Sequence, residues 1–381
     1  MAKISVVIPV YNAEEFLNDS LSSVLNQTFD DIELICVNDG SKDNSLNILK
    51  KFAEEDERIK IIDQENAGCG AARNRALDEV SGDYIYFFDP DDYILPDAFE
   101  RLYNNAKNNQ SDIVLFKVAK FRDGEPIDYS QPGFEFEKDF PSDVNFEELS
   151  FNYKDVKRHV LNSAFAPWTK LYKSEFINSY DDFRFPVNLP FDDVPFHVKS
   201  MLRASRISFV PDYLYHYRLS NPNSVNNTST NAIFIMDIID MVEDFLKENN
   251  FFDEFIKEFY LFKVNQIFYY IQTANLEEYY QRARTELLKV REDMASHNLD
   301  DDILAKWHLE YFEFIYASNT LEEYKLNLKV NQLKKQNKKL KKQNKMLKKE
   351  CNDLKKLNKE ISGSKSWKIT KPLRNIGNFK K

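Results

Sequence analysis

Three aspartates that follow an apolar run are the residues whose types and spacing point most directly to chemistry. Asp89, Asp91 and Asp92 come directly after Tyr-Ile-Tyr-Phe-Phe at 84–88. Carboxylates this close repel one another unless a cation lies among them. An Asp-x-Asp pair offers hard oxygen ligands but too few to enclose an ion, which suits Mg²⁺ or Mn²⁺ shared with the phosphates of a substrate. The alternative is an acidic turn in which Asp92 or Asp97 caps the next helix.

The elements that must position these carboxylates are expected within the first 120 residues, where short apolar runs alternate with helix-like segments. The apolar runs lie at 4–10, 32–38, 59–63, 84–88 and 112–118. The helix-like segments lie near 13–27, 43–56, 68–80 and 96–109. This alternation predicts β-α-β units and a parallel sheet. Such sheets bind ligands outside the carboxyl ends of their strands, so the polar residues that follow the runs are expected along one edge.

The next two hundred residues differ from this pattern. Residues 121–165 are rich in acidic residues, proline and aromatic residues, so we expect loops and short helices there. From about 229 to 324, apolar residues recur at three- and four-residue spacings, which predicts helices throughout. The aromatic side chains of this segment are interpreted as core residues rather than as a ligand-binding box.

A heptad pattern occupies residues 326–361. Leucine or isoleucine recurs every seventh residue, at Leu326, Leu333, Leu340, Leu347, Leu354 and Ile361. The second seam position is occupied by Val330, Asn337, Asn344, Cys351 and Asn358. Leucine at one seam position and asparagine at the other predicts a two-stranded coiled coil and therefore a homodimer. A single solvated, lysine-rich helix is the alternative.

The net charge of −10 hides a division of the chain into an acidic part and a basic part. Residues 325–381 hold 20 Lys and Arg against 3 Asp and Glu, whereas residues 1–324 hold 32 against 59. The two parts are therefore expected to meet different partners. Nucleic acid is not expected as a partner of the basic coil, because the coil lacks aromatic groups that could stack on bases.

The cysteines and the apolar runs indicate a cytoplasmic location. Cys36, Cys69 and Cys351 form no C-x-x-C pair, which argues against a disulfide framework and against a zinc site. We see no signal peptide and no run of about 18 uncharged apolar residues that could span a membrane.

Four motifs in order carry a resemblance to a known family. They read SVVIPVYNAEEFLNDSLSSVLNQ at 5–27, VNDGSKDNS at 37–45, NAGCGAARNRAL at 66–77 and GDYIYFFDPDDY at 82–93. Together they resemble the family 2 glycosyltransferases of surface-polysaccharide synthesis, which are nucleotide-sugar enzymes with the GT-A fold. Three further motifs look like the acceptor side of that family: PWTKLYKSEF at 167–176, LPFDDVPF at 189–196 and YHYRLSNPNSV at 215–225.

The resemblance implies a fold and a division of the chain. The fold class is α/β: a GT-A domain with a central, mostly parallel sheet, followed by an α-helical region and a C-terminal coiled coil. The implied parts are the nucleotide-sugar-binding half at 1–120, the acceptor-binding half at 121–228, a helical domain at 229–324, a basic coiled coil at 325–361 and a basic tail at 362–381.

The resemblance also implies a pocket for a UDP-sugar donor. The implied donor-binding residues are Pro9, Val10, Tyr11, Asn12, Asp39, Asn66, Arg73, Asp89, Arg218 and Ser224. Asp39 would accept the N3–H of uracil, and Asp91 would be the direct ligand of Mn²⁺ or Mg²⁺. Each role has a plainer alternative, in which Asp39 caps a helix, Tyr11 only packs and Arg73 is an exposed helix residue. Trp168 and Lys170 match positions near the donor sugar and the acceptor.

The general base is the remaining implied role. Family members carry a Glu-Asp pair where this chain has Asp192-Asp193, so the resemblance makes Asp193 the base and leaves Asp192 in place of the usual Glu. A helix N-cap is the alternative role for this pair. The implied reaction is an inverting transfer of a hexose or N-acetylhexosamine from a UDP-sugar to a hydroxyl of a glycan or lipid-linked acceptor. The rival function is a non-catalytic coiled-coil scaffold with a degenerate transferase domain.

The basic tail, SKSWKITKPLR at 364–374, resembles a segment found at the ends of surface-polysaccharide glycosyltransferases. Its lysines and its Trp367 predict a peripheral contact with the anionic inner face of the cell membrane. A solvated tail that packs only on the enzyme is the alternative. Other nucleotide-binding classes are excluded, because the first turn lacks G-x-G-x-x-G and no G-x-x-x-x-G-K occurs in the chain.

Overall fold

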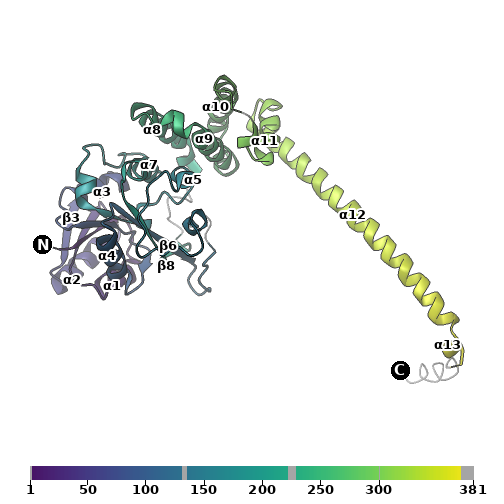
Figure 1. Ribbon diagram of the computed structural model, residues 1–381, viewed down its shortest axis with the longest axis horizontal. Coiled ribbons are helices and arrows are strands. Elements are labelled where there is room, and N and C mark those ends of the chain that lie inside the picture. Colours follow the sequence, from purple (N-terminus) through teal and green to yellow (C-terminus); the bar gives the residue numbers. More distant parts are fainter. Residues whose placement is uncertain (1, 131–134, 222–228, 300, 370–381) are drawn as a thin grey trace. The chain divides into compact units, whose positions relative to one another are not determined.

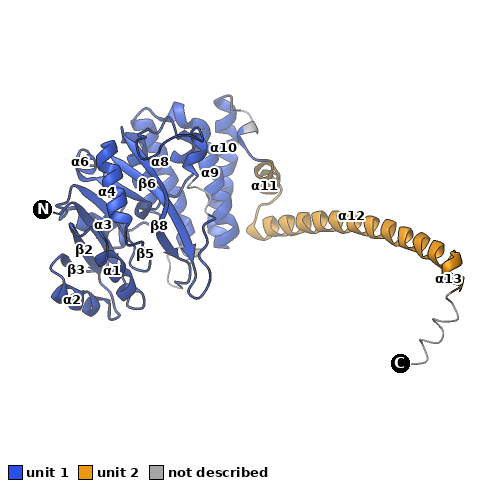
Figure 2. Ribbon diagram, turned by 60° about the horizontal axis from the view of Figure 1, so that its bottom comes forward, with its two compact units in different colours: residues 1–305 blue, residues 306–381 orange. Residues whose placement is uncertain are grey.

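The computed structural model describes residues 2–130, 135–221, 229–299 and 301–369. The chain divides into two compact units, residues 1–305 and residues 306–381 (Figure 2). The first unit contains the sheet with its helices and three further long helices. The second unit contains the helices of the basic C-terminal part.

The N-terminal half of the sheet follows the predicted alternation. Its strands and helices are β1 (Ile4–Val10), α1 (Leu17–Leu25), β2 (Ile32–Asp39), α2 (Ser45–Glu55), β3 (Ile59–Gln64), α3 (Cys69–Leu77) and β4 (Tyr84–Phe87). The sheet order in this half is β3, β2, β1, β4, and each strand is parallel to the strand next to it. All seven residues of β1 are buried, as expected for a central strand covered on both faces. The predicted parallel sheet is confirmed for this half.

The second half of the sheet mixes strand directions. It contains β5 (Tyr93–Ile94), α4 (Ala98–Asn109), β6 (Ile113–Phe121), β7 (Lys170–Lys173) and β8 (Ile207–Arg218). β7 runs antiparallel to both β4 and β6, whereas β6 and β8 are parallel. The order of the complete eight-stranded sheet is β3-β2-β1-β4-β7-β6-β8-β5. β7 therefore inserts a later stretch of the chain between β4 and β6.

In the described part of the segment between β6 and β8, the helices that precede α7 (Asp193–Arg203) are short, and strand β7 lies among them. These helices are η1 (Phe136–Asp139), α5 (Lys157–Val160), η2 (Pro167–Thr169) and α6 (Ser174–Asn178). The loops and short helices expected for 121–165 are found in the described part of that segment.

The sheet is covered by helices on its faces (Figure 1). Alternate residues of β1 pack into one core with side chains of α1 and α4. The members from β1 are Ile4, Val6, Ile8 and Val10. On the other side of β4, Phe87 contacts Phe185 and Phe196 in edge-to-face geometry. Packing on both faces therefore holds the parallel strands, and with them the polar residues that follow their carboxyl ends, in place.

Helices follow the sheet, as the periodicity predicted. They are η4 (Ser229–Phe234), α8 (Ile235–Glu248), α9 (Phe252–Ala274), α10 (Glu277–Ser296) and η5 (Asp301–Ile303). α9 packs against both α8 and α10, and its aromatic residues are mostly buried, including Phe255, Phe259 and Phe268. The interpretation of these aromatics as core residues is confirmed for these three.

The second unit contains α11 (Lys306–Tyr316), α12 (Leu321–Gly363) and α13 (Lys365–Ile369). α12 is continuous over 43 residues, and two side-chain hydrogen bonds cap its start. The Thr320 hydroxyl accepts from the N–H of Glu323, and the Glu323 carboxylate accepts from the N–H of Asn319. A helix through 326–361 is therefore found, while its pairing into a coiled coil stays a prediction. Among the described residues, no helix combines the length and the apolar character that crossing a bilayer requires.

Candidate active site

The carboxyl ends of β1, β2 and β4 bring the predicted site residues to one edge of the sheet. The register pairs Val10 with Asn38, and Val7 with Phe87. The loops that begin with Tyr11, Gly40 and Phe88 therefore start at neighbouring positions. The expectation of a common edge is met for these three loops.

Asp39 ties the loop after β2 to the loop after β3. Its carboxylate is almost fully buried and accepts hydrogen bonds from Gln64 Nε2 at 2.8 Å, Ala67 N at 2.8 Å and Gly68 N at 2.9 Å. Asn66 Nδ2 donates to the backbone oxygen of Asp39 at 3.0 Å. Asp39 therefore orders the backbone just before α3, and it does not cap α2. Its two oxygens have about four lone-pair sites, so three bonds leave room for one further donor.

Gly40 allows these two loops to approach closely. Its φ of +69° lies in the left-handed region, and a Cβ there would come within 2.8 Å of Asn66 N. A side chain at this position would push Asn66 away from the backbone of Asp39. The tight pairing of the two loops thus depends on glycine.

The loop after β1 begins with an exposed aromatic ring. Pro9 and Val10 are buried at the end of the strand, whereas Tyr11 is 50% exposed. Asn12 adopts a positive φ of 49°, and its Oδ1 accepts from Lys42 N at 2.7 Å. Asn12 therefore joins this loop to the one after β2. The alternative in which Tyr11 only packs in the core does not fit its exposure.

Arg73 links two motifs that are far apart in the sequence. Its Nη2 lies 3.2 Å from Asp89 Oδ1, and its Nη1 lies 3.2 Å from Asp192 Oδ2. The guanidinium is buried and lies over the ring of Phe185, with 5.2 Å from its carbon to the ring centroid. Arg73 is therefore not an exposed helix residue, and it binds a carboxylate of the Asp-x-Asp motif and one of the Asp-Asp pair.

Asp92 is a buried structural carboxylate. It accepts from Tyr215 OH at 2.5 Å and from Arg218 N at 2.6 Å, so it fixes the end of β8 beside the loop after β4. Burial, together with the charges of Asp91 and Asp89, raises its pKa well above the ordinary value. Asp97 lies at the N-cap position of α4 but accepts no capping bond through its side chain. The alternative in which Asp92 or Asp97 caps a helix is therefore not found.

Asp91 and Arg218 meet at the same place. Asp91 Oδ2 accepts from Asn221 Nδ2 at 2.7 Å, and the Asp91 backbone oxygen accepts from Arg218 Nε at 2.7 Å. Burial and the neighbouring charge of Asp89 raise the pKa of Asp91. Arg218 also forms an ion pair with Asp123, a residue that none of the sequence motifs contains. Ser224, the other predicted residue of this loop, lies outside the described residues.

The described ranges contain no group of three or more His, Cys, Asp or Glu side chains placed to hold a metal ion. The acidic edge instead offers Asp89 and Asp91 on one loop, with buried cationic groups on either side. His216, on β8, has an imidazole that contacts the ring of Tyr93 at 4.6 Å between centroids. That contact packs the imidazole against an aromatic ring of the neighbouring strand β5.

The Asp192-Asp193 pair lies at the start of α7. Asp192 occupies the N-cap position, but its side chain accepts from Arg73 rather than from the helix backbone. Asp193 forms no ion pair with any described residue. Burial raises the pKa of both carboxyls, and the Arg73 guanidinium opposes that shift. Arg73 thus neutralises the Asp192 carboxylate, whereas the Asp193 carboxylate is not held in an ion pair with a described residue.

The loop before α7 carries unusual backbone geometry and contacts α9. Phe191 has a φ of +62°, which is rare for a bulky residue and is found where surrounding structure enforces it. Its ring lies 5.2 Å from that of Tyr270, measured between centroids. The charge of Asp193 contributes, after burial and Tyr269, to a raised pKa of Tyr270. Helix α9 therefore borders the same site, a neighbour that sequence periodicity did not reveal.

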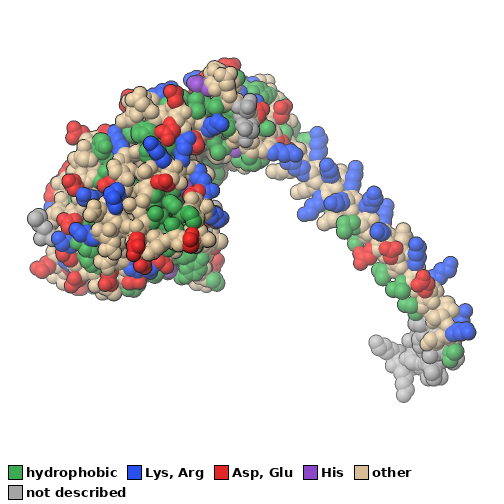
Figure 3. All heavy atoms as spheres, viewed as in Figure 1, with side chains coloured by type: hydrophobic (Ala, Val, Ile, Leu, Met, Phe, Trp, Pro, Cys, Tyr) green, Lys and Arg blue, Asp and Glu red, His purple; other side chains and the backbone are tan. Residues whose placement is uncertain are grey.

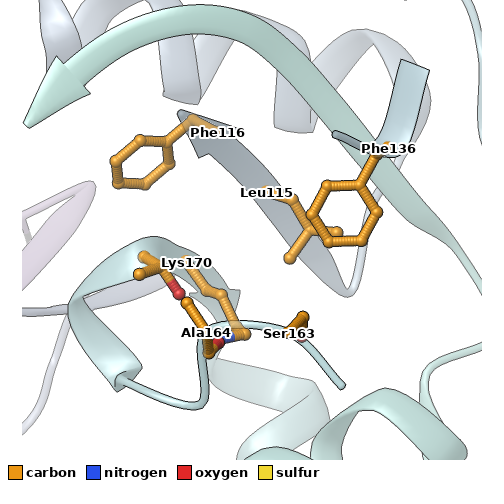
Figure 4. A pocket seen from close by; sticks show the side chains of 7 residues that line it. Leu115, Phe116, Phe136, Ser163, Ala164 and Lys170 are labelled. Atoms are coloured by element: carbon orange, nitrogen blue, oxygen red, sulfur yellow. The ribbon is translucent and has the colours of Figure 1, made fainter. Parts of the chain in front are cut away.

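Lys170 is buried beneath this site. Its Nζ donates to Ala164 O at 3.2 Å, to Ala166 O at 3.0 Å and to Thr169 Oγ1 at 2.7 Å. Burial lowers the pKa of Lys170 to about 7, and the charge of Asp193 partly opposes the shift. Figure 4 shows Lys170 beside a small pocket that Phe116 and other apolar side chains line.

Trp168 packs in a stack of aromatic rings. Its ring lies 4.7 Å from that of Tyr215 and 5.2 Å from that of Tyr217, and both rings are nearly parallel to it. Trp168 therefore packs on β8, the strand that carries Arg218.

The comparisons with known proteins assign a family. Residues 5–172 match the family model described as glycosyl transferase family 2. The putative glycosyltransferase EpsH of Bacillus subtilis is 31% identical over 268 residues, which are 67% of this chain and 72% of that protein. The chain belongs to glycosyl transferase family 2, as its four ordered motifs predicted.

Other relatives share only part of their length with it. Glycosyltransferase GlyA of Streptococcus pneumoniae is 37% identical over 219 residues, which are 57% of this chain but 30% of that protein. The chain thus spans less than a third of that relative. A crystal structure of Staphylococcus aureus TarS in complex with UDP-GlcNAc is similar with a TM-score of 0.48 and 23% identity, over 74% of this chain and 83% of that one.

Proposed function

We propose that this chain is an inverting, metal-dependent glycosyltransferase. It transfers a hexose or N-acetylhexosamine from a UDP-sugar to a hydroxyl of a glycan or lipid-linked acceptor, in the synthesis of cell-surface polysaccharide or glycoconjugate. The observation that carries the proposal is the Arg73 guanidinium between Asp89 and Asp192, residues that belong to the donor and acceptor motifs and lie on different loops. A degenerate domain would have no need to keep these motifs joined by a buried ion pair.

The donor is proposed to bind along the edge of β1 and β2. Tyr11 offers an exposed ring for the uracil, and Asp39 has a lone pair left for the uracil N3–H. Pro9 and Val10 supply the backbone of the pocket, and Asn12 and Asn66 hold its three loops together. Arg218 and Ser224 are proposed to close over the diphosphate. Because Arg218 is paired with Asp123, closure would exchange that carboxylate for a phosphate oxygen.

The metal is proposed to be Mn²⁺ or Mg²⁺, held by Asp91 beside Asp89. The donor set fits such an ion, because Asp91 is a carboxylate whose pKa is raised by burial and by the neighbouring charge of Asp89. One protein carboxylate with open positions suits an ion that takes its other ligands from water and a diphosphate. When bound, the ion would supply charge stabilisation for the UDP leaving group.

Asp193 is proposed as the general base. A sugar hydroxyl is a weak nucleophile, so a positioned carboxylate must accept its proton as the new bond forms. The acceptor oxygen attacks C1 of the sugar while the bond from C1 to the UDP oxygen breaks, and the configuration at C1 inverts. Arg73 holds Asp192 as its counter-ion, so Asp193 is the carboxylate free to take the proton. Tyr270 of α9 borders the acceptor side.

The remaining parts have proposed roles outside the chemistry. The five-part division of the chain given above is kept as a proposal, and α9 is proposed to border the acceptor. Residues 326–361 are proposed to join two copies of the chain. The tail at 362–381 is proposed to contact anionic lipid at the inner face of the cell membrane, which gives the protein a cytoplasmic, peripheral location. No contact with nucleic acid is proposed.

The decisive experiment is Asp193→Asn. We expect UDP release from UDP-glucose, UDP-galactose and UDP-N-acetylglucosamine to fall by about 10²-fold or more, because general-base catalysis contributes about 10²–10⁴-fold. The thermal stabilisation by UDP with Mn²⁺ should be kept. Asp181→Asn is the matched control, since Asp181 is exposed. Turnover of Asp193→Asn near that of the control would overturn the base assignment, and a wild-type chain that UDP with Mn²⁺ does not stabilise would favour the scaffold.

A further inference from the structure

α12 exposes a seam that carries an apolar side chain at every seventh residue. Six of its side chains, spaced seven residues apart, are between 43% and 60% exposed. These are Leu326, Leu333, Leu340, Leu347, Leu354 and Ile361. The rest of the helix is rich in lysine. The face seen in Figure 3 shows lysines along the helix and hydrophobic side chains gathered toward its C-terminal end. A seam of this kind is typical of a helix that packs against another helix.

α11 covers a different side of α12. Glu310 of α11 accepts from Asn331 Nδ2 at 2.7 Å and pairs with Lys335 at 2.6 Å. Leu321 and Tyr324 of α12 are buried on that same side. In the heptad, Tyr324 and Asn331 occupy b positions. Leu321 and Lys335 occupy f positions. Both positions face away from the a and d seam. The packing within the second unit therefore uses the outer side of α12 and leaves the seam uncovered.

We propose that a second copy of this chain covers the seam, and that the two α12 helices run parallel and in register. This inference deepens the proposed self-association and rests on it, but it does not depend on the glycosyl transfer. Two features of the seam select the direction of the second helix: the asparagines at position a and the charges at positions e and g.

The asparagines favour the parallel arrangement. Asn337, Asn344 and Asn358 occupy the a positions. In a parallel, in-register pair each asparagine lies opposite its own counterpart, so the two amides donate to each other. In an antiparallel pair each a position lies opposite a d position, which here is leucine or isoleucine. Each amide would then be buried against an apolar side chain without a hydrogen-bond partner, which disfavours the antiparallel pair.

The flanking charges favour the same arrangement. Every e position between Leu333 and Ile361 is a lysine, whereas the g positions are Gln336, Gln343, Glu350 and Leu357. The e-position lysines are Lys334, Lys341, Lys348 and Lys355. A parallel pair sets each g side chain against the next e side chain of the other helix, so Glu350 meets Lys355 and the glutamines meet lysines. An antiparallel pair sets e against e, and lysine would face lysine along the whole seam.

Salt should strengthen, and not weaken, the association of the two α12 helices. Residues 326–361 hold 13 lysines against three acidic residues, so two such helices repel one another overall. Added salt screens this repulsion, because the Debye length is about 8–10 Å at about 0.1–0.15 M salt. The contacts between buried leucines do not depend on this screening. Association through this seam is therefore expected to strengthen between 0.05 and 0.5 M NaCl. A contact held by opposite charges would weaken over the same range.

Cys351 provides a direct test of direction and register. It occupies an a position and is exposed, so in the proposed pair the two Cys351 thiols face each other. Copper phenanthroline with oxygen should oxidise the full-length Cys69→Ser chain to a disulfide-linked dimer, because two thiols then lose two protons and two electrons to oxygen. Lys349→Cys in a Cys69→Ser/Cys351→Ser chain is the matched control, since position 349 lies on the outer side and should give little cross-linking.

The oligomeric state completes the test. Light scattering of the intact chain should give twice the monomer mass, and Leu340→Ser with Leu347→Ser should return it to the monomer. Lys342→Ser with Lys349→Ser, on the outer side of the same turns, should leave the dimer in place. A chain that is monomeric at every salt concentration would overturn the proposal. A dimer that cross-links through position 349 as readily as through Cys351 would overturn the parallel register.

Discussion

Arg73 shows how a single side chain joins the two halves of the site. Its guanidinium contacts Asp89 and Asp192, and it is buried with an aromatic ring below it. The two carboxylates that it neutralises come from motifs that would otherwise repel each other at the sheet edge. A planar guanidinium can serve two carboxylates at once, whereas a lysine ammonium is a point charge.

Removing this cation should destabilise the fold as well as the site. We expect Arg73→Met to lower the free energy of unfolding by about 3–5 kcal/mol, because it leaves a buried carboxylate without a partner. Arg75→Met on the same helix is the control: its exposed pair with Glu79 should contribute less than about 1 kcal/mol. Thermal unfolding of both variants measures the difference. Equal melting temperatures would show that the buried pair contributes no more than the exposed one.

Lys170 should make stability depend on pH in a recognisable way. Its folded pKa of about 7 lies below the ordinary value of 10.5, so between those limits the unfolded chain binds more protons than the folded chain. Stability is therefore expected to rise with pH over that window, by up to about 1.4 kcal/mol per pH unit. Lys170→Met should lack this rise. Unfolding of both proteins from pH 7.5 to 9.5 tests it, and parallel curves would contradict the lowered pKa.

At the scale of the elements, α3 and the loop before α7 must approach closely for Arg73 to reach Asp192. Gly70 makes this possible, because a Cβ at that position would come within 2.3 Å of Pro186 O and 2.8 Å of Asp192 Oδ2. The helix therefore presents a bare backbone to the loop. Neither the helix pattern nor the motif spacing of the sequence indicates that this contact exists.

Gly70→Ala should consequently separate α3 from that loop. We expect a loss of about 1–3 kcal/mol, the range for overpacking a tight contact, and weaker stabilisation by UDP with Mn²⁺. Gly363→Ala is the control, since a Cβ there would meet nothing within 4 Å. Differential scanning fluorimetry with and without UDP measures both effects. A Gly70→Ala chain as stable as Gly363→Ala would show that the loop yields without cost.

The sequence predicted those elements whose signal is local. β1, β2 and β4 were readable because a strand buried on both faces is a continuous apolar run. The place of β7 between β4 and β6 was not readable, since antiparallel pairing with β4 joins segments that are far apart in the chain. The same distinction between local and long-range signals applies to the residues of the site. The motifs selected Asp39 and Arg73, but the pairing of Arg218 with Asp123 has no local signal in the irregular segment after β6.

At the scale of the whole chain, the acidic unit with the sheet and the basic C-terminal part are proposed to meet different partners. The donor site uses loops at the sheet edge, whereas the lysines are concentrated after residue 324. Each lysine or arginine near an anionic leaflet contributes about 1 kcal/mol. Binding to lipid should therefore depend on the tail and weaken with salt, opposite to the pairing of α12.

Deletion of residues 362–381 tests this division. We expect the full chain to float with vesicles that contain 30% anionic lipid at about 0.1 M salt, within the range where surface attraction persists, and the truncated chain to stay behind. UDP with Mn²⁺ should stabilise both chains equally, because the donor site is untouched. Vesicles of zwitterionic lipid alone are the control. Equal flotation of the two chains would assign membrane contact to another part of the molecule.

The length of α12 has a consequence for where acceptors are met. An uninterrupted helix of 43 residues keeps its two ends about 65 Å apart, at about 1.5 Å per residue. A flexible tether of the same number of residues would have a root-mean-square span of only about 36 Å. If lipid holds the far end, the helix acts as a stiff spacer. Acceptor chains that project well beyond the headgroups would then be favoured over sugars that lie against the bilayer.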